Sequence, residues 1–208
     1  MSKRKARRAD QRGKVLIVMD ALKQVDEMLQ SLVGQLVWSA RRTVGTSVSM
    51  QFGEPHRIVR GPGRASEDAS PVVRQILNRR LVSIKGDLSL SIRDAQWSIS
   101  TKEKVVNWES SEALVDDMLL YHLDGQKVLS ADRGVDATVL EFDLGTTMRL
   151  EKSIFPTDMA SVLWVIKRWG GASVGLFNSG SAIPPNWRYG EGVDAQSELP
   201  PKLPPSDS

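Results

Sequence analysis

The sequence predicts an α+β fold, mainly β, made of two tandem copies of a helix plus an antiparallel β-meander. We expect the copies to pack as a pseudo-symmetric sandwich or barrel-like domain. Three observations predict this fold. Two segments carry apolar residues at helical spacing, each is followed by residues that alternate with a period of two, and the sequence where helix meets strand occurs twice.

The repeated segments run from Leu32 to Arg42 and from Leu123 to Arg133, with identical residues at seven of eleven aligned positions and no gap. Both read Leu-x-Gly-Gln-x-Val. A glycine here ends a helix in a left-handed cap, so that the next strand begins at once. We therefore interpret the shared glycine and glutamine as residues that mark the end of a helix within an internal duplication, and not as a binding site. Chance similarity between two hairpins is the alternative.

The first copy begins with an amphipathic helix over residues 19–32, whose apolar stripe stops at Gly34. A strand is predicted over residues 48–52, where apolar and polar side chains alternate. Further strands are predicted before it, over residues 37–41, and after it, over residues 56–60. Residues 61–70 combine Gly, Pro and Ser without periodicity and predict a loop. Residues 80–101 predict a meander of further strands, with a tight hairpin turn at Gly86 and Asp87.

The second copy begins where residues 110–122 return to helical spacing, with Ser110 or Ser111 as the N-cap. Strands are predicted over residues 127–131, 138–142, 147–151, 162–168 and 173–177. The chain therefore divides into a basic disordered tail (1–14), a first repeat (15–104), a second repeat (105–178) and a Pro-rich, largely disordered tail (179–208).

The charge of the chain is unevenly distributed. The formal net charge is +3, yet residues 1–14 alone carry seven cations and one acid. Such a tail could neutralise phosphates of DNA, RNA or an anionic membrane in a salt-dependent, sequence-independent way. The alternatives are a solvated extension and a natural start at Met19, so whether residues 1–18 belong to the natural protein stays open. The candidate phosphate contacts are Lys3, Arg4, Lys5, Arg7, Arg8, Arg12 and Lys14.

The sequence predicts a cytoplasmic protein with no membrane partner. The apolar run from Val15 to Met19 is shorter than the core of a signal peptide, and no run is long enough to cross a bilayer. The absence of Cys excludes disulfides, thiolate metal sites and Cys nucleophiles, and it fits a reducing compartment.

Six tryptophans are many for 208 residues, and Trp serves both small β cores and interaction hot spots. Trp97 and Trp164 lie in phase with apolar neighbours and are expected in the core. Trp108 and Trp187, together with Tyr189, lie in less regular surroundings. These three are the candidate interaction residues.

No residue set reaches a catalytic or metal-binding signature, and no cofactor is expected. His56 and His122 are the only imidazoles, and structural roles explain both better than a triad. Gly61 and Gly63 lack the context of a phosphate-binding loop. The acids, which include Glu141 and Asp143 on one strand face, are explained by solvent exposure. They are Asp87, Asp94, Asp116, Asp117, Asp132, Asp136, Glu141 and Asp143.

A family resemblance rests on five short segments: the run from Leu32 to Trp38, the turn Phe52-Gly-Glu-Pro55, Arg79-Arg80 leading into Gly86-x-Leu-x-Leu90, Trp97-Ser-Ile99, and Leu123-Asp-Gly-Gln126. In these segments the chain resembles an uncharacterised family of bacterial hypothetical β-rich proteins over residues 30–165. The chain departs from that pattern at Ser89, Ser91 and Arg93, where the family often has aromatic residues. The resemblance implies a bacterial origin and a β-rich fold, and it implies no catalytic set.

These observations favour a small non-enzymatic interaction protein, either immunity-protein-like or a regulatory binding module, whose partner is another protein. The alternatives are a nucleic-acid-binding protein that uses the basic tail and a carboxylate-based hydrolase. The sequence leaves the oligomeric state open. Function is expected where the two copies differ, namely at residues 61–70, at Trp38 opposite Leu129 in the alignment, and in the two tails.

Overall fold

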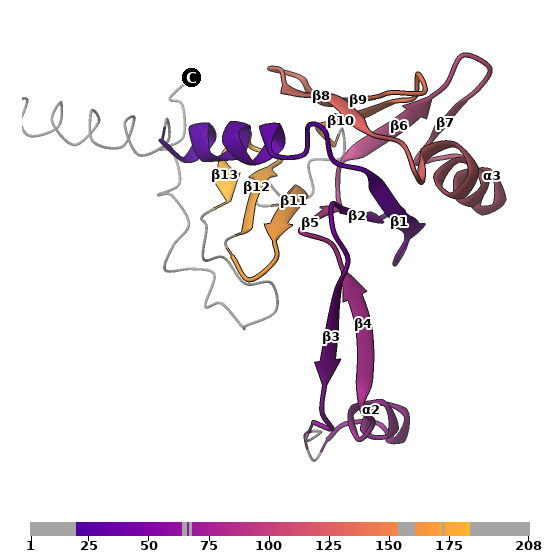
Figure 1. Cartoon of the computed structure of the whole chain (residues 1–208), viewed down its shortest axis with the longest axis vertical. Coiled ribbons are helices and arrows are strands. Elements are labelled where there is room, and N and C mark those ends of the chain that lie inside the picture. Colours follow the sequence, from indigo (N-terminus) through magenta and orange to yellow (C-terminus); the bar gives the residue numbers. More distant parts are fainter. Residues whose placement is uncertain (1–19, 64–65, 67, 154–160, 172, 184–208) are drawn as a thin grey trace, which may run out of the picture.

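The computed structural model describes residues 20–63, 66, 68–153, 161–171 and 173–183. Its strands form two antiparallel sheets and a separate two-stranded ribbon (Figure 1). The predicted α+β, mainly β class is confirmed. The strand order of each sheet is open, so the expectation of a barrel-like closure is wrong.

The six-stranded sheet has the order β1 (Val37–Arg42), β2 (Val48–Phe52), β5 (Leu88–Ile92), β11 (Val162–Arg168), β12 (Ser173–Phe177) and β13 (Ala182–Ile183). The five-stranded sheet has the order β7 (Val105–Asn107), β6 (Gln96–Ser100), β10 (Thr147–Glu151), β9 (Ala137–Phe142) and β8 (Val128–Arg133). Each sheet contains strands from both halves of the chain. β6 pairs with β10 and β11 pairs with β5, so the last strands of each half join the sheet of the other half.

Two helical segments pack on this body. The N-terminal helix is described over residues 20–30, and the second is α3 (Glu112–Asp117), continued by the π-helical turn η1 (Met118–Leu123). Ser111 occupies the N-cap position of α3, but its side chain makes no capping hydrogen bond. The helices bury two matching apolar stripes: Val25, Met28, Leu29 and Leu32 in the first, and Val115, Met118, Leu119 and Leu123 in the second.

Each helix is tied to the first strand of the other half. Arg133 of β8 binds Asp26 of the N-terminal helix through two hydrogen bonds of 2.8 Å. The aligned residue Arg42 of β1 forms an ion pair of 2.7 Å with Glu112 of α3. The two exchanged contacts connect segments that are far apart in the sequence, and they hold the halves together.

The two repeated motifs meet each other directly. Leu36 and Lys127 form an antiparallel bridge, and the hydrogen bonds around it occur in matching pairs. Gly34 N–H donates to Val128 O and Gly125 N–H donates to Val37 O, both at 2.8 Å. Val37 N–H donates to Gln126 O at 2.8 Å and Val128 N–H donates to Gln35 O at 3.0 Å. Both glycines have a positive φ, of 82° and 86°, as expected for left-handed helix caps.

A single apolar core joins both sheets and both helical segments. Trp97 and Trp164 are 2% and 1% exposed, which confirms their predicted place in the core. Trp97 of β6 lies opposite Leu150, and Trp164 of β11 lies opposite Ile92. The two tryptophans thus occupy corresponding positions in the two sheets.

The predicted meander over residues 80–101 is wrong. β4 (Leu81–Lys85) pairs with β3 (His56–Arg60), whereas β5 and β6 belong to different sheets. Gly86 and Asp87 therefore make no hairpin turn. Alternation identifies a strand, but its pairing partner is chosen by packing against distant segments.

A helix that the sequence analysis did not predict, α2 (Pro71–Leu77), lies between β3 and β4. The side chain of Ser70 caps it by accepting the Val73 N–H at 3.3 Å, and Pro71 occupies its first turn. A Ser followed by Pro at the first helical position is a known start signal, so this helix could have been found.

Candidate binding surface: the basic arm

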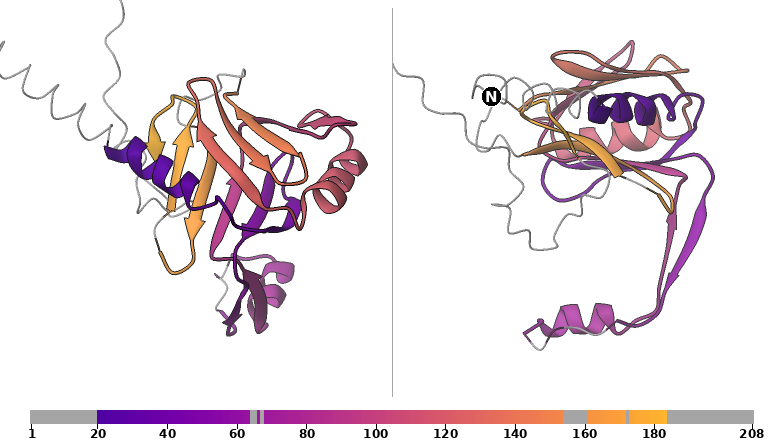
Figure 2. Two further views of the ribbon diagram at one scale, coloured as in Figure 1. Left: turned by 45° about the horizontal axis from the view of Figure 1, so that its top comes forward. Right: turned by 90° about the vertical axis from the view of Figure 1, so that its left-hand side faces the viewer.

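The arm, defined as residues 56–85, is the most unusual feature of the molecule. It comprises β3, α2 and β4 and projects from the body of the protein (Figures 1 and 2). The body is defined as residues 20–55 and 86–183. The ribbon belongs to neither large sheet, and α2 has no buried residue. An isolated two-stranded hairpin is at best marginally stable in water, because its apolar side chains have no further layer to pack against.

One face of the ribbon is apolar and exposed. Arg57 lies opposite Ile84, and Val59 lies opposite Val82. Residues directly opposite in an antiparallel pair point to the same side. Val59, Val82 and Ile84 are 44%, 51% and 57% exposed. The tip helix adds further exposed apolar side chains, Val72, Val73 and Ile76.

The arm is strongly basic. Residues 56–85 carry six Arg and one Lys against two acids, a net charge of +5. The body carries twelve basic and eighteen acidic residues, a net charge of −6. Arg57, Arg60 and Arg80 are exposed, and none of the ion pairs among the described residues involves them. The basic character therefore belongs to the arm as well as to the N-terminal tail.

The root of the arm is fixed to the body by three side chains. His56 Nε2 lies 2.7 Å from Asp87 Oδ1, and the His56 ring stacks on Trp169 with centroids 5.2 Å apart and an interplanar angle of 5°. The hydrogen bond from His56 lowers the pKa of Asp87, and the Glu54 backbone N–H, 2.8 Å from Oδ2, lowers it further. The two ends of the arm are thereby joined to each other and to the end of β11.

Backbone packing also holds this root in place. Gly86 is buried, and its N–H donates to the Gln51 side chain at 3.1 Å. A Cβ on Gly86 would lie 2.3 Å from Phe52 O, so only glycine fits there. The arm therefore leaves the body at a defined point between β2 and β5.

A second feature is a polar hollow of about 190 Å³ beside β6. Trp108 is half-buried at its edge and packs against the core, so this candidate interaction residue is only partly accessible. The hollow is lined by Thr46, Arg93, Asp94, Ala95, Gln96, Trp108, Ser153 and Ser161. A two-carboxylate hydrolase needs a pair of acids across a cleft, whereas Asp94 is the one acid among the described residues of this lining.

The remaining candidate residues are dispersed. Trp187, Tyr189 and the cations of residues 1–14 lie outside the described residues. Trp38 is half-buried and its Nε1 donates to Gly53 O at 2.8 Å, close to where the arm leaves the body. The aligned Leu129 is 57% exposed. Within the predicted loop over residues 61–70, the described residues 61–63, 66 and 68–70 belong to no helix or strand and lie between β3 and α2.

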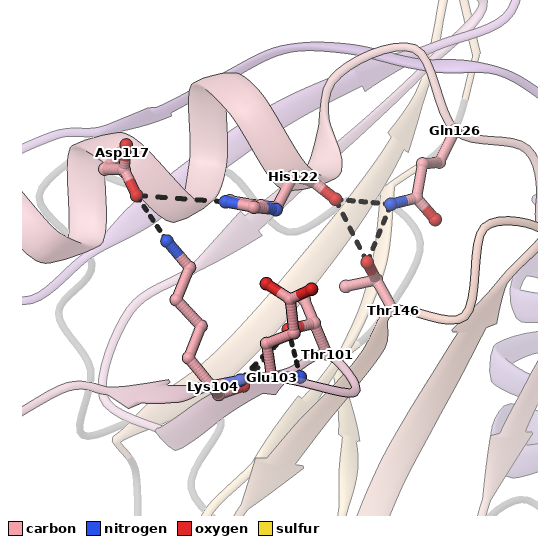
Figure 3. Close-up of polar contacts among 7 residues, drawn as sticks. All are labelled: Thr101, Glu103, Lys104, Asp117, His122, Gln126 and Thr146. Atoms are coloured by element: carbon pink, nitrogen blue, oxygen red, sulfur yellow. Dashed lines mark hydrogen bonds and ion pairs between the residues drawn. The ribbon is translucent and has the colours of Figure 1, made fainter.

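His122 lies in a polar network at the edge of the five-stranded sheet (Figure 3). Its ring nitrogen is 3.9 Å from Asp117, which also binds Lys104. The bond from Lys104 lowers the pKa of Asp117. The His122 carbonyl accepts hydrogen bonds from Gln126 and Thr146. The network ties the β6–β7 hairpin and the turn after β9 to η1, which is a structural role.

Among the described residues, no group of three or more His, Cys, Asp or Glu could hold a metal ion. Within the same part of the chain, no helix has the length and apolar character needed to span a bilayer. The geometry defines an antiparallel α+β protein with two sheets and a projecting basic arm. No family model, curated protein or solved structure matches this chain.

The arm was not predicted as a unit, although its sequence carries two signals. The charge of residues 56–85 stands out from that of their neighbours, and Ser70-Pro71 marks a helix start between two strands. The clamp of His56, Asp87 and Trp169 gave no such signal, since its members come together only through tertiary structure.

Proposed function

We propose that this protein is a non-enzymatic binding protein that contacts another protein through its arm. The observation that supports this function is the exposed face of Val59, Val82 and Ile84 on a ribbon that also exposes Arg57, Arg60 and Arg80. An apolar face on an isolated ribbon is costly in water and becomes stable when a partner covers it. Arginine with apolar residues is a composition typical of protein interfaces.

The proposal is tested by changing Val59, Val82 and Ile84 together to Ser, which keeps the length and charge of the arm. Exposed apolar residues of the body provide a matched control, with Val44, Val135 and Leu144 changed to Ser; they are 89%, 86% and 78% exposed. We expect in-cell cross-linking followed by mass spectrometry to recover cross-links from the arm of the wild type and the control. The arm variant should lose them. Equal cross-linking of all three proteins would contradict the proposal.

A nucleic acid is the second candidate partner, because the net charges of the arm (+5) and of residues 1–14 (+6) together exceed the net charge of the whole chain (+3). A two-stranded β-ribbon also fits the major groove of DNA. Fluorescence anisotropy with labelled DNA and RNA would compare the full chain with residues 19–208 and with Arg57→Glu/Arg60→Glu. Salt-sensitive binding that is weaker in both variants would favour this candidate.

We also propose that the body arose by tandem duplication of a helix–strand–strand–strand unit. The paired hydrogen bonds at Leu36 and Lys127, the ion pairs of Arg42 and Arg133, and the matched positions of Trp97 and Trp164 support this origin. In this scheme the third strand of the first unit is β5 and not β3, so the arm is an insertion. Homologous sequences with two short turns and no arm would support the scheme.

The biological role that we propose follows from the same surface. A cytoplasmic bacterial protein with a projecting contact element and no described metal site suits a regulator or an immunity protein, which acts by covering another molecule. Loss of protection in cells that carry the arm variant, with the body control still protective, would support the immunity role.

A further inference from the structure

We propose that the partner of the arm is a second copy of this chain, so that two copies exchange arms. The inference rests on the proposed function, namely that the arm binds a protein, and it identifies that protein. In this dimer, the arm of each copy lies on an acidic shoulder of the other copy. The shoulder is defined as the exposed surface of residues 101–123, which comprise the β6–β7 turn, β7, the connection to α3, α3 and η1.

The shoulder has the chemistry that complements the arm. It carries Glu103, Glu109 and Asp116, which are exposed, and no ion pair among the described residues involves them. Of its two cations, Lys104 is neutralised by Asp117 (Figure 3), whereas Lys102 in the β6–β7 turn is exposed. It also exposes four apolar side chains: Val105 at 68%, Leu114 at 51%, Leu120 at 55% and Tyr121 at 73%. A basic apolar ribbon and an acidic apolar surface thus occur in one chain.

The two surfaces do not meet within one copy. The arm points away from the body, whereas α3 packs on the side of the body beside β1 and β7 (Figures 1 and 2). A two-fold axis relating two copies would create the contact twice. Because the arm carries +5 and the body −6, each of the two contacts gains from charge attraction. Reciprocal exchange also closes the assembly at two copies and avoids an open chain of contacts.

A second copy explains the arm better than an unrelated acidic protein does, because it accounts for two features at once. The apolar face of the arm and the apolar residues of the shoulder are both covered in the dimer. An unrelated partner on the arm would leave Leu120 and Tyr121 exposed.

The experiment uses charge reversal in the full chain and measures mass by sedimentation equilibrium. The arm variant carries Arg57→Glu, Arg60→Glu and Arg80→Glu. The shoulder variant carries Glu103→Arg, Glu109→Arg and Asp116→Arg. A control variant reverses two exposed acids of the body away from the shoulder, Asp132→Arg and Asp136→Arg. Circular dichroism checks that every variant is folded.

We expect the wild type and the control to be dimers, and the arm and shoulder variants to be monomers, with at least a tenfold rise in the dissociation constant. Mixing the arm variant with the shoulder variant should restore a dimer, because both contacts in the mixed pair join opposite charges. A structural defect in either variant would not be repaired by mixing. A folded wild type that stays monomeric at every concentration would overturn the inference, as would a dimer that both reversals leave intact.

The outcomes also separate this inference from the proposed function. A monomeric wild type whose arm still cross-links to a host protein through Val59, Val82 and Ile84 would contradict the dimer and support the binding function. A monomer that cross-links to nothing would contradict both the dimer and the binding function. A monomer whose arm binds DNA or RNA moves the conclusion to the second candidate function.

Discussion

The connection from β2 to β5 and the connection from β9 to β10 each join two neighbouring antiparallel strands, but the two connections differ greatly in length. Both follow a buried phenylalanine, Phe52 or Phe142, and both begin near a glycine with positive φ, Gly53 at 75° and Gly145 at 84°. After β9 the chain turns at once, with Phe142 N–H donating to Thr146 O at 2.9 Å. After β2 it first builds the whole arm.

The short turn shows what the body requires. Leu144 N–H donates to the Gln126 side chain at 3.2 Å, so the turn is held by the repeated motif itself. The arm adds residues 56–85 without adding a core residue, and longer loops cost progressively more entropy. A segment that adds no core residue and exposes apolar and cationic side chains supports the binding function that we propose.

The largest effect is expected where the two connections start. Phe52→Ala and Phe142→Ala should each lower the free energy of unfolding by about 3–5 kcal/mol, because both rings are almost fully buried. Urea unfolding followed by circular dichroism measures this. Similar losses would show that the half with the arm is as well packed as the other. A loss of stability at Phe52 below half of that at Phe142 would show that the half with the arm is less well packed.

The next effect concerns the root of the arm. Gly86→Ala should destabilise the protein by about 1–3 kcal/mol, since the new Cβ collides with the backbone of Phe52. Gly61→Ala is the control, because no atom lies within 4 Å of a Cβ there. It should change the stability by less than about 0.5 kcal/mol. Thermal unfolding of both variants decides this, and an unaffected Gly86→Ala would contradict the close approach.

A smaller change in stability is expected when the arm is exchanged for the short turn. Replacing residues 53–87 with Asp-Leu-Gly, the sequence of residues 143–145, should lower the free energy of unfolding by only about 1 kcal/mol, because no core side chain is removed. The unfolding transition in urea should stay cooperative. A chain that no longer unfolds cooperatively would mean that the arm is part of the folded core.

The smallest effects concern pH, and they have opposite signs at the arm root and in the body. The pKa of Asp87 is lowered from 3.8 by His56 and Glu54, so its stabilising contribution is present above pH 3.8 and is lost as the pH falls through the lowered value. Burial raises the pKa of Asp124, although the N–H groups of Ala40 and Ser39 oppose this. Its contribution is therefore largest below pH 3.8 and is lost as the pH rises through the raised value.

These pH effects are measured as the free energy of unfolding from about pH 2 to about pH 7, the range in which carboxyl groups titrate. Asp87→Asn should flatten the fall at the acidic end. Asp124→Asn should instead remove a decline above pH 3.8. Carboxyl-carbon NMR titration gives a direct check, because the midpoint of Asp87 should lie below that of Asp124.

The sequence by itself determined the local elements. The strands β2, β3, β10, β11 and β12 were predicted at their observed bounds. Alternation identified β2, whose Val48, Met50 and Phe52 are all buried, since a half-buried strand places its apolar side chains on one face. Gly34 and Gly125 marked the helix ends, because a left-handed cap strongly favours glycine. The duplicated motif and the buried Trp97 and Trp164 were also visible in the sequence.

Only the tertiary structure decided which strands pair and which surface stays exposed. β3 pairs with β4 and not with β2, although it follows β2 directly in the sequence. The exchange of β6 and β11 between the halves, and the clamp of His56 with Trp169, join residues far apart in the sequence. A local pattern indicates that a side chain needs burial or a partner. Whether that side chain is buried within the molecule depends on the packing of the whole chain.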